Sequence, residues 1–346
     1  MIAGPLLGGI AVQLIAWPSL VLGWPTLLVG MAIGRIIEGF STASSAPSTL
    51  SYLSFATSGA PSLRGRVMAF YEMATVVGIG GGFVAGAIVW DRLGHTAFIA
   101  VSVIYVASLA LFVRIRGTSA GAPRGRGLEA HALISVLRRP RMLRFAPAWL
   151  CVNTIVGVWG THSAFQLTGE EQSGQYLAGG FTGTSLGAGF AFFTIAFMLG
   201  VYLWGLVIGT RRKSSIMLLT LSGIYVICLS LFVVNHIGQT GGFGLGAFTV
   251  LFGVGVVVAS GFTPAALAYL ADLSEEAVHQ RGAAMGLYSV MLGLGQLLGG
   301  ALGGPFADVG GVDGLILLTA ILGTIALGTL VALRRDEAVG RPQPEN

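Results

Sequence analysis

Long uninterrupted apolar runs constrain the fold of this chain more than any other feature of its sequence. Most of them extend over about 20 residues or more, the length that an α-helix needs to cross the ~30 Å hydrocarbon core of a membrane. A membrane-spanning β-barrel would instead show stretches of roughly ten residues with alternating polarity. Only 10% of the residues are charged, against about 25% in soluble domains. The sequence therefore predicts an all-α membrane protein.

The apolar runs predict about ten transmembrane helices. Gly and Pro inside several of them are compatible with this interpretation, because membrane helices tolerate both residues. The two cysteines, Cys151 and Cys228, lie inside apolar runs, and we expect neither a disulfide nor a metal site from them. The expected helices cover residues 2–22, 26–52, 66–90, 95–113, 144–166, 185–209, 215–235, 243–271, 283–306 and 313–333.

The basic residues are unevenly distributed between alternate loops. One side of the membrane receives 17 of the 19 Lys and Arg residues, the other side receives Arg92, and Arg35 lies inside a helix. Because loops rich in Lys and Arg stay in the cytoplasm, we expect a multi-pass protein of the plasma (cytoplasmic) membrane with both termini cytoplasmic. Membrane orientation explains the basic balance better than nucleic-acid binding does, because these residues lie in short loops.

A basic loop divides the chain into two parts. We expect an N-terminal part of four helices at 1–113, a cytoplasmic linker at 114–143, a C-terminal part of six helices at 144–335, and a cytoplasmic tail at 336–346. Within the linker, apolar residues from Leu128 to Leu137 have near-helical spacing. They fit a short helix on the inner leaflet, where arginines contact anionic lipid; a solvated basic loop is the alternative.

Residues 47–94 are repeated 217 positions later without a gap. Fourteen of these 48 positions are identical; they include Pro, Tyr, Arg and Asp, which chance matching of glycine-rich helices does not readily reproduce. Four helices map onto four, so the two copies have the same orientation. Parallel repeats of this kind occur in transporters, with the binding site at the repeat interface. The identical residues of the first copy are Pro47, Leu50, Tyr52, Leu53, Ala60, Arg64, Gly65, Met68, Tyr71, Gly78, Gly82, Gly86, Asp91 and Gly94.

The repeat leaves two helices without a counterpart. Subtraction of 217 from residues 144–209 places their partners before Met1. We therefore expect a pattern of six plus six helices that lacks its first two, which corresponds to about 75 residues.

Three local patterns resemble motifs of the major facilitator superfamily, and the resemblance covers the chain from that family's third helix to its twelfth. Residues 35–39 (RIIEG) look like the arginine-and-glycine motif of the fourth helix, with Glu38 where Gln or another polar residue is usual. Residues 64–66 (RGR) follow in the next cytoplasmic loop, and Arg281-Gly282 repeats their first two residues.

The third pattern, residues 78–87, is similar to the glycine-rich antiporter motif of the family's fifth helix. It has Phe83 where Pro is expected and Ala87 where Gly is expected. The family's best-known loop motif would lie before Met1. Its second-half echo, at residues 205–213, keeps the basic cluster but has Gly209 where the family has aspartate.

The resemblance implies a secondary active transporter of small solutes that works by alternating access, as a monomer in contact with membrane lipid. It implies coupling to protons or another ion, with a slight tilt toward efflux from the antiporter motif. We expect no enzymatic activity and no cofactor. Two alternatives stay open: a non-transporting fragment, from a misplaced start or a decayed gene, and a membrane-embedded enzyme.

Four polar residues within the expected helices are candidates for a substrate or proton path. Arg35 lies near mid-membrane with Glu38 one turn away, and an intramembrane charge indicates function by default; a buried ion pair that locks the helix is the alternative. Asn153 and His162 lie on the helix expected at 144–166, which is expected to line the cavity. Interhelical packing for Asn153 and an interfacial position for His162 are the alternatives.

A second set of charged residues lies toward the expected cytoplasmic ends of helices. For Arg64, Glu72, Asp272 and Arg281 we expect gating or inner-loop contacts, with Glu72 paired to loop arginines. Glycines four residues apart predict close helix packing; these are Gly78, Gly82 and Gly86 and their repeats Gly295, Gly299 and Gly303. The sequence shows no metal-ligand set, nucleophile triad or phosphate loop.

Overall fold

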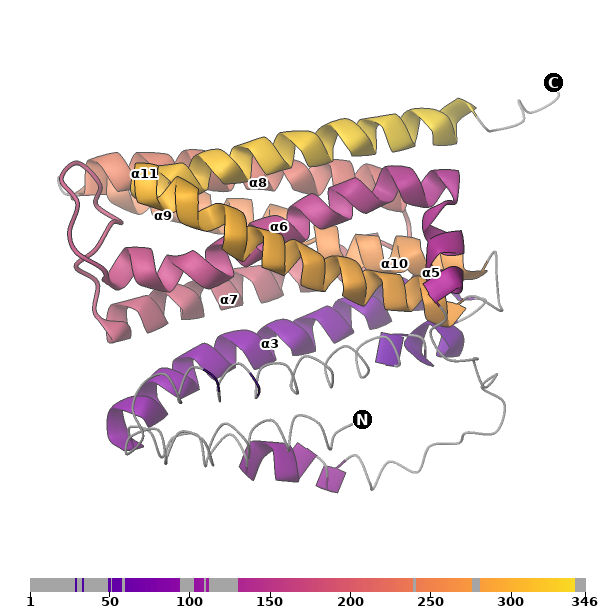
Figure 1. Cartoon of the computed structure of the whole chain (residues 1–346), viewed down its shortest axis with the longest axis horizontal. Helices are drawn as coiled ribbons and strands as arrows, with labels where there is room; N and C mark the ends of the chain where they lie inside the picture. Colours follow the sequence, from indigo (N-terminus) through magenta and orange to yellow (C-terminus); the bar gives the residue numbers. More distant parts are fainter. Residues whose placement is uncertain are drawn as a thin grey trace.

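The computed structural model describes residues 29, 33, 49–50, 52–57, 60–93, 103–108, 110–111, 130–238, 241–275 and 281–339. These residues form α-helices joined by turns, with one isolated bridge between Gln172 and Gln175. The all-α membrane class is confirmed. The principal helices are α3 (Pro61–Leu93), α5 (Ala130–Leu137), α6 (Pro140–Thr168), α7 (Gly183–Val207), α8 (Lys213–Ile237), α9 (Phe243–Ala259), α10 (Phe262–Glu275) and α11 (Arg281–Val339) (Figure 1).

Six helical stretches among the described residues are long and apolar enough to cross a membrane. Large apolar side chains such as Ile195, Val250 and Leu297 are exposed around the bundle, which lipid solvates and water does not. The expected helices at 2–22, 26–52 and 95–113 lie wholly or mostly outside the described residues. The count of ten therefore stays a prediction.

The helix expected at 243–271 is divided into α9 and α10 at Ser260 and Gly261. Pro264 has no N–H to bond the carbonyl of Ser260, four residues earlier, so the helical ladder cannot continue there. The Trp204 indole of α7 packs at Gly261, where a side chain would collide with it, and its Nε1 donates to the carbonyl of Val257 at 3.0 Å. A tryptophan from another helix thus stabilises the break.

The long element α11 reverses its direction at Gly311 (Figure 1). Gly311 has φ 58°, a left-handed conformation that glycine adopts at little cost. Its two arms correspond to the separate helices expected at 283–306 and 313–333. The short helix expected in the linker is confirmed as α5, which leads directly into α6.

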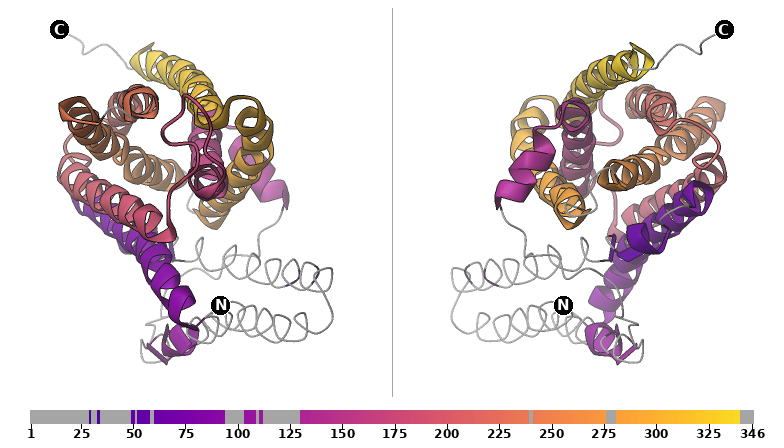
Figure 2. Two further views of the ribbon diagram at one scale, coloured as in Figure 1. Left: turned by 90° about the vertical axis from the view of Figure 1, so that its left-hand side faces the viewer. Right: turned by 90° about the vertical axis from the view of Figure 1, so that its right-hand side faces the viewer.

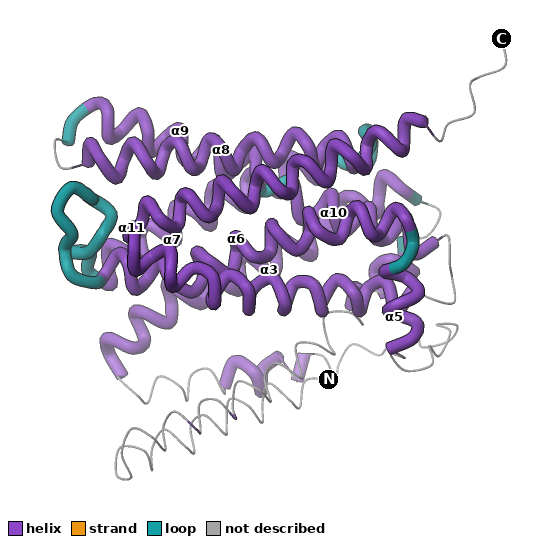
Figure 3. Tube along the Cα trace, turned by 45° about the horizontal axis from the view of Figure 1, so that its top comes forward, coloured by secondary structure: helices purple, strands orange, loops and turns teal. Residues whose placement is uncertain are grey.

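The bundle has two distinct ends, which are seen in Figure 2. The basic end holds the starts of α3, α6 and α8 with Arg64, Arg141 and Lys213. The loop end holds residues 169–182, a compact loop between α6 and α7 (Figure 3).

Helices α3 and α7 lie side by side along most of their length (Figures 1 and 2). Their contacts are made largely by small residues: Gly65 lies against Ile208, Gly205 against Ala69, and Gly80 against Thr194. Near the loop end, the rings of Phe83 and Phe190 are stacked, with centroids 4.7 Å apart and an interplanar angle of 3°. In this α3–α7 seam the glycines therefore let side chains of one helix approach the backbone of the other.

Candidate functional site

Asp272 joins three helices at the basic end of the bundle. Its Oδ1 accepts a hydrogen bond from Nη1 of Arg64 at 2.6 Å, and its Oδ2 lies 2.8 Å from Nζ of Lys213. Arg64 is almost fully buried, and its Nη2 also donates to the carbonyl of Thr57 at 3.3 Å. One carboxylate from α10 thus binds cations from α3 and from α8, across 208 positions of sequence in the case of Arg64.

Helix dipoles explain why these charges need one another. Lys213 is the first residue of α8, where the helix end is already partly positive, and Asp272 lies in the last turn of α10, where it is partly negative. Each charge is unfavourable at its own helix end. Pairing them compensates both, so the arrangement favours contact between α8 and α10.

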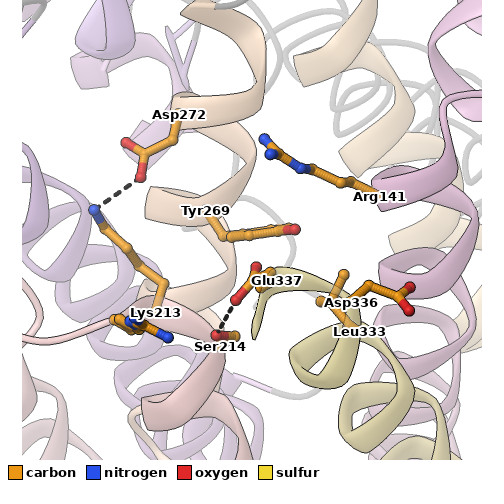
Figure 4. A pocket seen from close by; sticks show the side chains of 9 residues that line it. Arg141, Lys213, Ser214, Tyr269, Asp272, Leu333, Asp336 and Glu337 are labelled. Atoms are coloured by element: carbon orange, nitrogen blue, oxygen red, sulfur yellow. Dashed lines mark hydrogen bonds and ion pairs between the residues drawn. The ribbon is translucent and has the colours of Figure 1, made fainter. Parts of the chain in front are cut away.

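A cavity of about 400 Å³ opens beside Asp272 (Figure 4). Its lining includes Arg141, Lys213, Tyr269 and Glu337, whose Oε2 accepts a hydrogen bond from Ser214 at 2.6 Å. Three basic and three acidic side chains contribute to the wall, so the cavity has no strong preference for one sign of charge. Among the described residues, no group of three His, Cys, Asp or Glu side chains could hold a metal ion.

Buried aromatic rings close the bundle deeper than Asp272. The ring of Trp149 lies 5.1 Å from that of Tyr288 and 6.1 Å from those of Phe145 and Phe262. Phe145 lies 5.2 Å from Tyr269. The cluster joins α6, α10 and α11, and the burial of its members shows that the centre of the bundle is tightly packed here.

Glu72 forms no ion pair with the arginines whose side chains the structure describes; its expected pairing with loop arginines stays a prediction, since residues 112–129 lie outside the described part. It lies eight residues beyond Arg64 on α3, which is about 12 Å along the helix. Arg64 itself is paired with Asp272. Glu72 is therefore buried well inside the bundle, away from the charged end.

Asn153 and His162 lie where α6 contacts α11. The amide of Asn153 donates to the carbonyl of Trp149 within its own helix at 2.8 Å. His162 Nε2 lies 2.9 Å from the carbonyl oxygen of Gly300. Both residues pack against the glycines of α11, so the structure brings them together in a helix contact; their expected role in a substrate or proton path stays a prediction.

The two glycine strips have different surroundings. A side chain at Gly295, Gly299 or Gly303 would overlap Asn153, Thr154 or His162, so α6 packs directly on this face of α11. At Gly78, Gly82 and Gly86 of α3, an added Cβ atom would have no neighbour within 4 Å. The expected close packing is present for the second strip and absent for the first, within the part of the chain that the structure describes.

Three expected site residues have no described side chain. Arg35 and Glu38 lie outside the described residues, so their proximity stays a prediction. Arg281 begins α11, and its side chain likewise lies outside the described part.

A polar network at the loop end was not expected from the sequence. Gln175 Oε1 accepts from the Val312 N–H at 3.0 Å and from Asn235 Nδ2 at 3.2 Å, and Asn235 Nδ2 also donates to Asp313 at 2.9 Å. Asn235 Oδ1 accepts from the Leu177 N–H at 2.8 Å. This network fastens the 169–182 loop to α8 and to the turn of α11. Its members come from distant parts of the chain, although polar residues at the ends of apolar helices were a signal.

The sequence profile described as Major Facilitator Superfamily matches residues 173–346, about half of the chain. No curated protein matches the chain by sequence.

Solved structures of several membrane transporters have a similar fold. The human organic anion transporter MFSD10 (TETRAN) has a TM-score of 0.66 and 15% identity, with 94% of this chain and 76% of that protein covered. The transporter FucP in its outward conformation has a TM-score of 0.55 and 13% identity, and a variant of the E. coli fucose:proton symporter FucP has a TM-score of 0.57 and 12% identity. Each FucP comparison covers 96% of this chain and 83% of the other protein. At these identities the similarity concerns the fold.

Proposed function

Since the chain belongs to the Major Facilitator Superfamily, a family of membrane transporters, we propose that it carries small solutes across the plasma membrane by alternating access, coupled to a proton or ion gradient. In this proposal the parts of the chain before and after residues 114–143 rock against each other, with the basic end on the cytoplasmic side. The excess of Lys and Arg at that end supports the orientation.

The bridge from Arg64 to Asp272 is the observation that carries the proposal. It joins the N-terminal part to the C-terminal part at one end of the bundle, as a gate requires. Asp272 is 37% exposed, so water can replace its partners when the two parts separate. An ion pair in which one partner is exposed to solvent contributes modestly to stability. The pair of Arg64 and Asp272 can therefore break and re-form each time the gate opens and closes.

The similar structures do not identify the solute or the direction of transport. One is an organic anion transporter and another is a fucose:proton symporter, so their solutes differ. The lean toward efflux rests on residues 78–87, whose pattern resembles an antiporter motif. Proton coupling rests on ionisable residues within the helices, Glu38 and Glu72.

Transport can be tested in proteoliposomes that contain a pH-sensitive dye. Sugars, organic anions and organic cations are added in turn, and solute-dependent proton flux is recorded. We expect a flux with at least one class, and a strong reduction in Asp272→Asn, because the gate loses its shared carboxylate. The exposed Glu170→Gln at the loop end serves as the control. Solute flux that is unaffected by Asp272→Asn would contradict the gating role.

The alternative is that the 346-residue form does not transport by itself. The exposed glycine face of α3 favours this candidate, because the matching face of α11 is covered by α6. Proteoliposomes with this form are compared with an in-frame form extended upstream of Met1. Transport that appears only with the extension supports the alternative, and transport by the shorter form rules it out.

A further inference from the structure

Glu72 is an acidic residue in the membrane-crossing part of α3, and its side chain is buried. It lies nine residues after Leu63, where the apolar stretch begins, which is about 14 Å into a core of ~30 Å. Its relative exposure is 8%. A carboxyl group at this depth marks a functional position by default.

No described residue forms a hydrogen bond or an ion pair with the Glu72 side chain. The sequence of α7, which packs along α3, contains no charged residue. On α10, Asp272 is occupied by Arg64 and Lys213 about two turns nearer the basic end. Of the described titratable groups, Tyr71 on α3 and Tyr288 on α11 lie within electrostatic reach of Glu72. Among the side chains that the structure describes, the carboxyl group thus has no cation beside it to offset a negative charge.

Tyr288 connects Glu72 to the aromatic cluster that closes the bundle. Its ring lies 5.1 Å from the ring of Trp149, whose indole Nε1 is buried without a hydrogen-bond partner among the described residues. Two buried polar groups therefore lie near Tyr288, Glu72 from α3 and the Trp149 indole from α6, and neither is bonded to a residue that the structure describes.

Burial of an ionised carboxylate without a partner is far more costly than burial of the neutral acid. The closed arrangement around Glu72 consequently favours the neutral acid, and separation of α3 from α10 and α11 would let water stabilise the carboxylate. We propose that Glu72 is a proton-binding site that couples protonation to closure of the basic end. Closure binds one proton, and opening releases it on that side.

This inference rests on the proposed alternating access and adds the group that carries the proton. Coupling between two events is reciprocal: if closure favours the protonated acid, protonation favours closure. The ratio of closed to open molecules then falls about tenfold for each pH unit above the titration midpoint, because the two states differ by one proton.

The experiment measures opening directly and needs no solute. Spin labels are placed at Leu63→Cys on α3 and Thr210→Cys after α7, in a background with Cys151→Ala and Cys228→Ala. Both labelled positions are exposed at the basic end, and neither replacement removes a charge. Distance distributions are recorded in lipid nanodiscs from about pH 5 to about pH 9. We expect the short-distance population to decrease with rising pH.

Glu72→Gln has the shape of the protonated acid but cannot ionise. It should remove the pH response, so that the short distance between the labels is retained at every pH. Glu72→Asp should preserve a response, and Glu170→Gln should leave it unchanged. A wild-type distribution that is independent of pH, or a response that persists in Glu72→Gln, would overturn the inference. A response that depends on Glu72 in a protein that carries no solute would uphold this site while the proposed transport fails.

Discussion

The Nε2 atom of His236 lies 3.3 Å from Oδ2 of Asp313 at the loop end of the bundle. The other ring nitrogen, Nδ1, lies 2.9 Å from the carbonyl oxygen of Phe232. Both ring nitrogens of His236 thus lie next to an oxygen atom. The contact ties the end of α8 to the second arm of α11 and complements the network around Asn235.

Asn235→Ala should destabilise the protein by about 1–3 kcal/mol, because it leaves the Leu177 N–H and the Gln175 and Asp313 oxygens with one partner fewer. Thermal unfolding in detergent checks this value. Ser222→Ala is the matched control, since its exposed hydroxyl bonds only to its own helix at Leu219. Equal melting temperatures for the two variants would show that the network contributes nothing to stability.

Arg64 and Lys213, the two cations that bind Asp272, should contribute unequally to the stability of the folded protein. Arg64 is 2% exposed at its side chain and Lys213 is 18% exposed, so water screens the lysine more. Double-mutant cycles with Arg64→Ala, Lys213→Ala and Asp272→Asn should give a larger coupling energy for Arg64, of about 1–3 kcal/mol, than for Lys213, at about 1 kcal/mol or less. Added salt should weaken the lysine coupling more. Equal couplings would refute this order.

Gly299→Ala and Gly82→Ala test the difference between the two glycine strips. A methyl group at Gly299 would overlap the backbone of Thr154 and Val158, and forced separation of packed helices costs about 1–3 kcal/mol. A methyl group at Gly82 meets open space, and Ala is the better helix former by up to about 1 kcal/mol. Melting temperatures should fall for the first variant and stay equal or rise for the second. A large loss in Gly82→Ala would indicate that another helix covers this face.

Gly311→Ala should destabilise the turn of α11, whereas Gly310→Ala should have little effect. Gly311 has φ 58° and its position for a side chain is crowded by Gln172 and Gln175, while Gly310 is open. A left-handed conformation costs a non-glycine residue about 1–2 kcal/mol. Limited proteolysis near the turn would detect the loosened ends. Equal cleavage rates in the two variants would contradict the role of the left-handed turn.

The sequence was sufficient for those features that depend on local hydrophobicity. The helix expected at 144–166 is observed as Pro140–Thr168, and the one expected at 215–235 as Lys213–Ile237. The α9–α10 break was missed because a proline such as Pro264 is compatible with a continuous membrane helix, and because Trp204, which stabilises the break, belongs to a different helix. Apolar composition alone continues smoothly through Ser260 and Gly261.

Pairing between distant residues was the part that the sequence could not supply. Arg64 and Asp272 were both expected at a gate, but nothing in one sequence pairs two residues 208 positions apart. The glycines of α3 and those of α11 have the same spacing in the sequence. Only the structure shows that α6 packs on the glycines of α11 while those of α3 are exposed. The expected pairing of Glu72 with loop arginines stays a prediction, because the residues from 112 to 129 lie outside the described part of the chain.

The α3–α7 seam has a mechanical consequence. Side chains on facing helices normally interdigitate, and they keep the two helix axes about 8–10 Å apart. At Gly65, Gly205 and Gly80, a residue of the facing helix instead occupies the space that a side chain would need, and near the loop end the rings of Phe83 and Phe190 are stacked. The seam therefore sets the spacing of α3 and α7, and a side chain added at Gly80 or Gly205 would force the two helices apart.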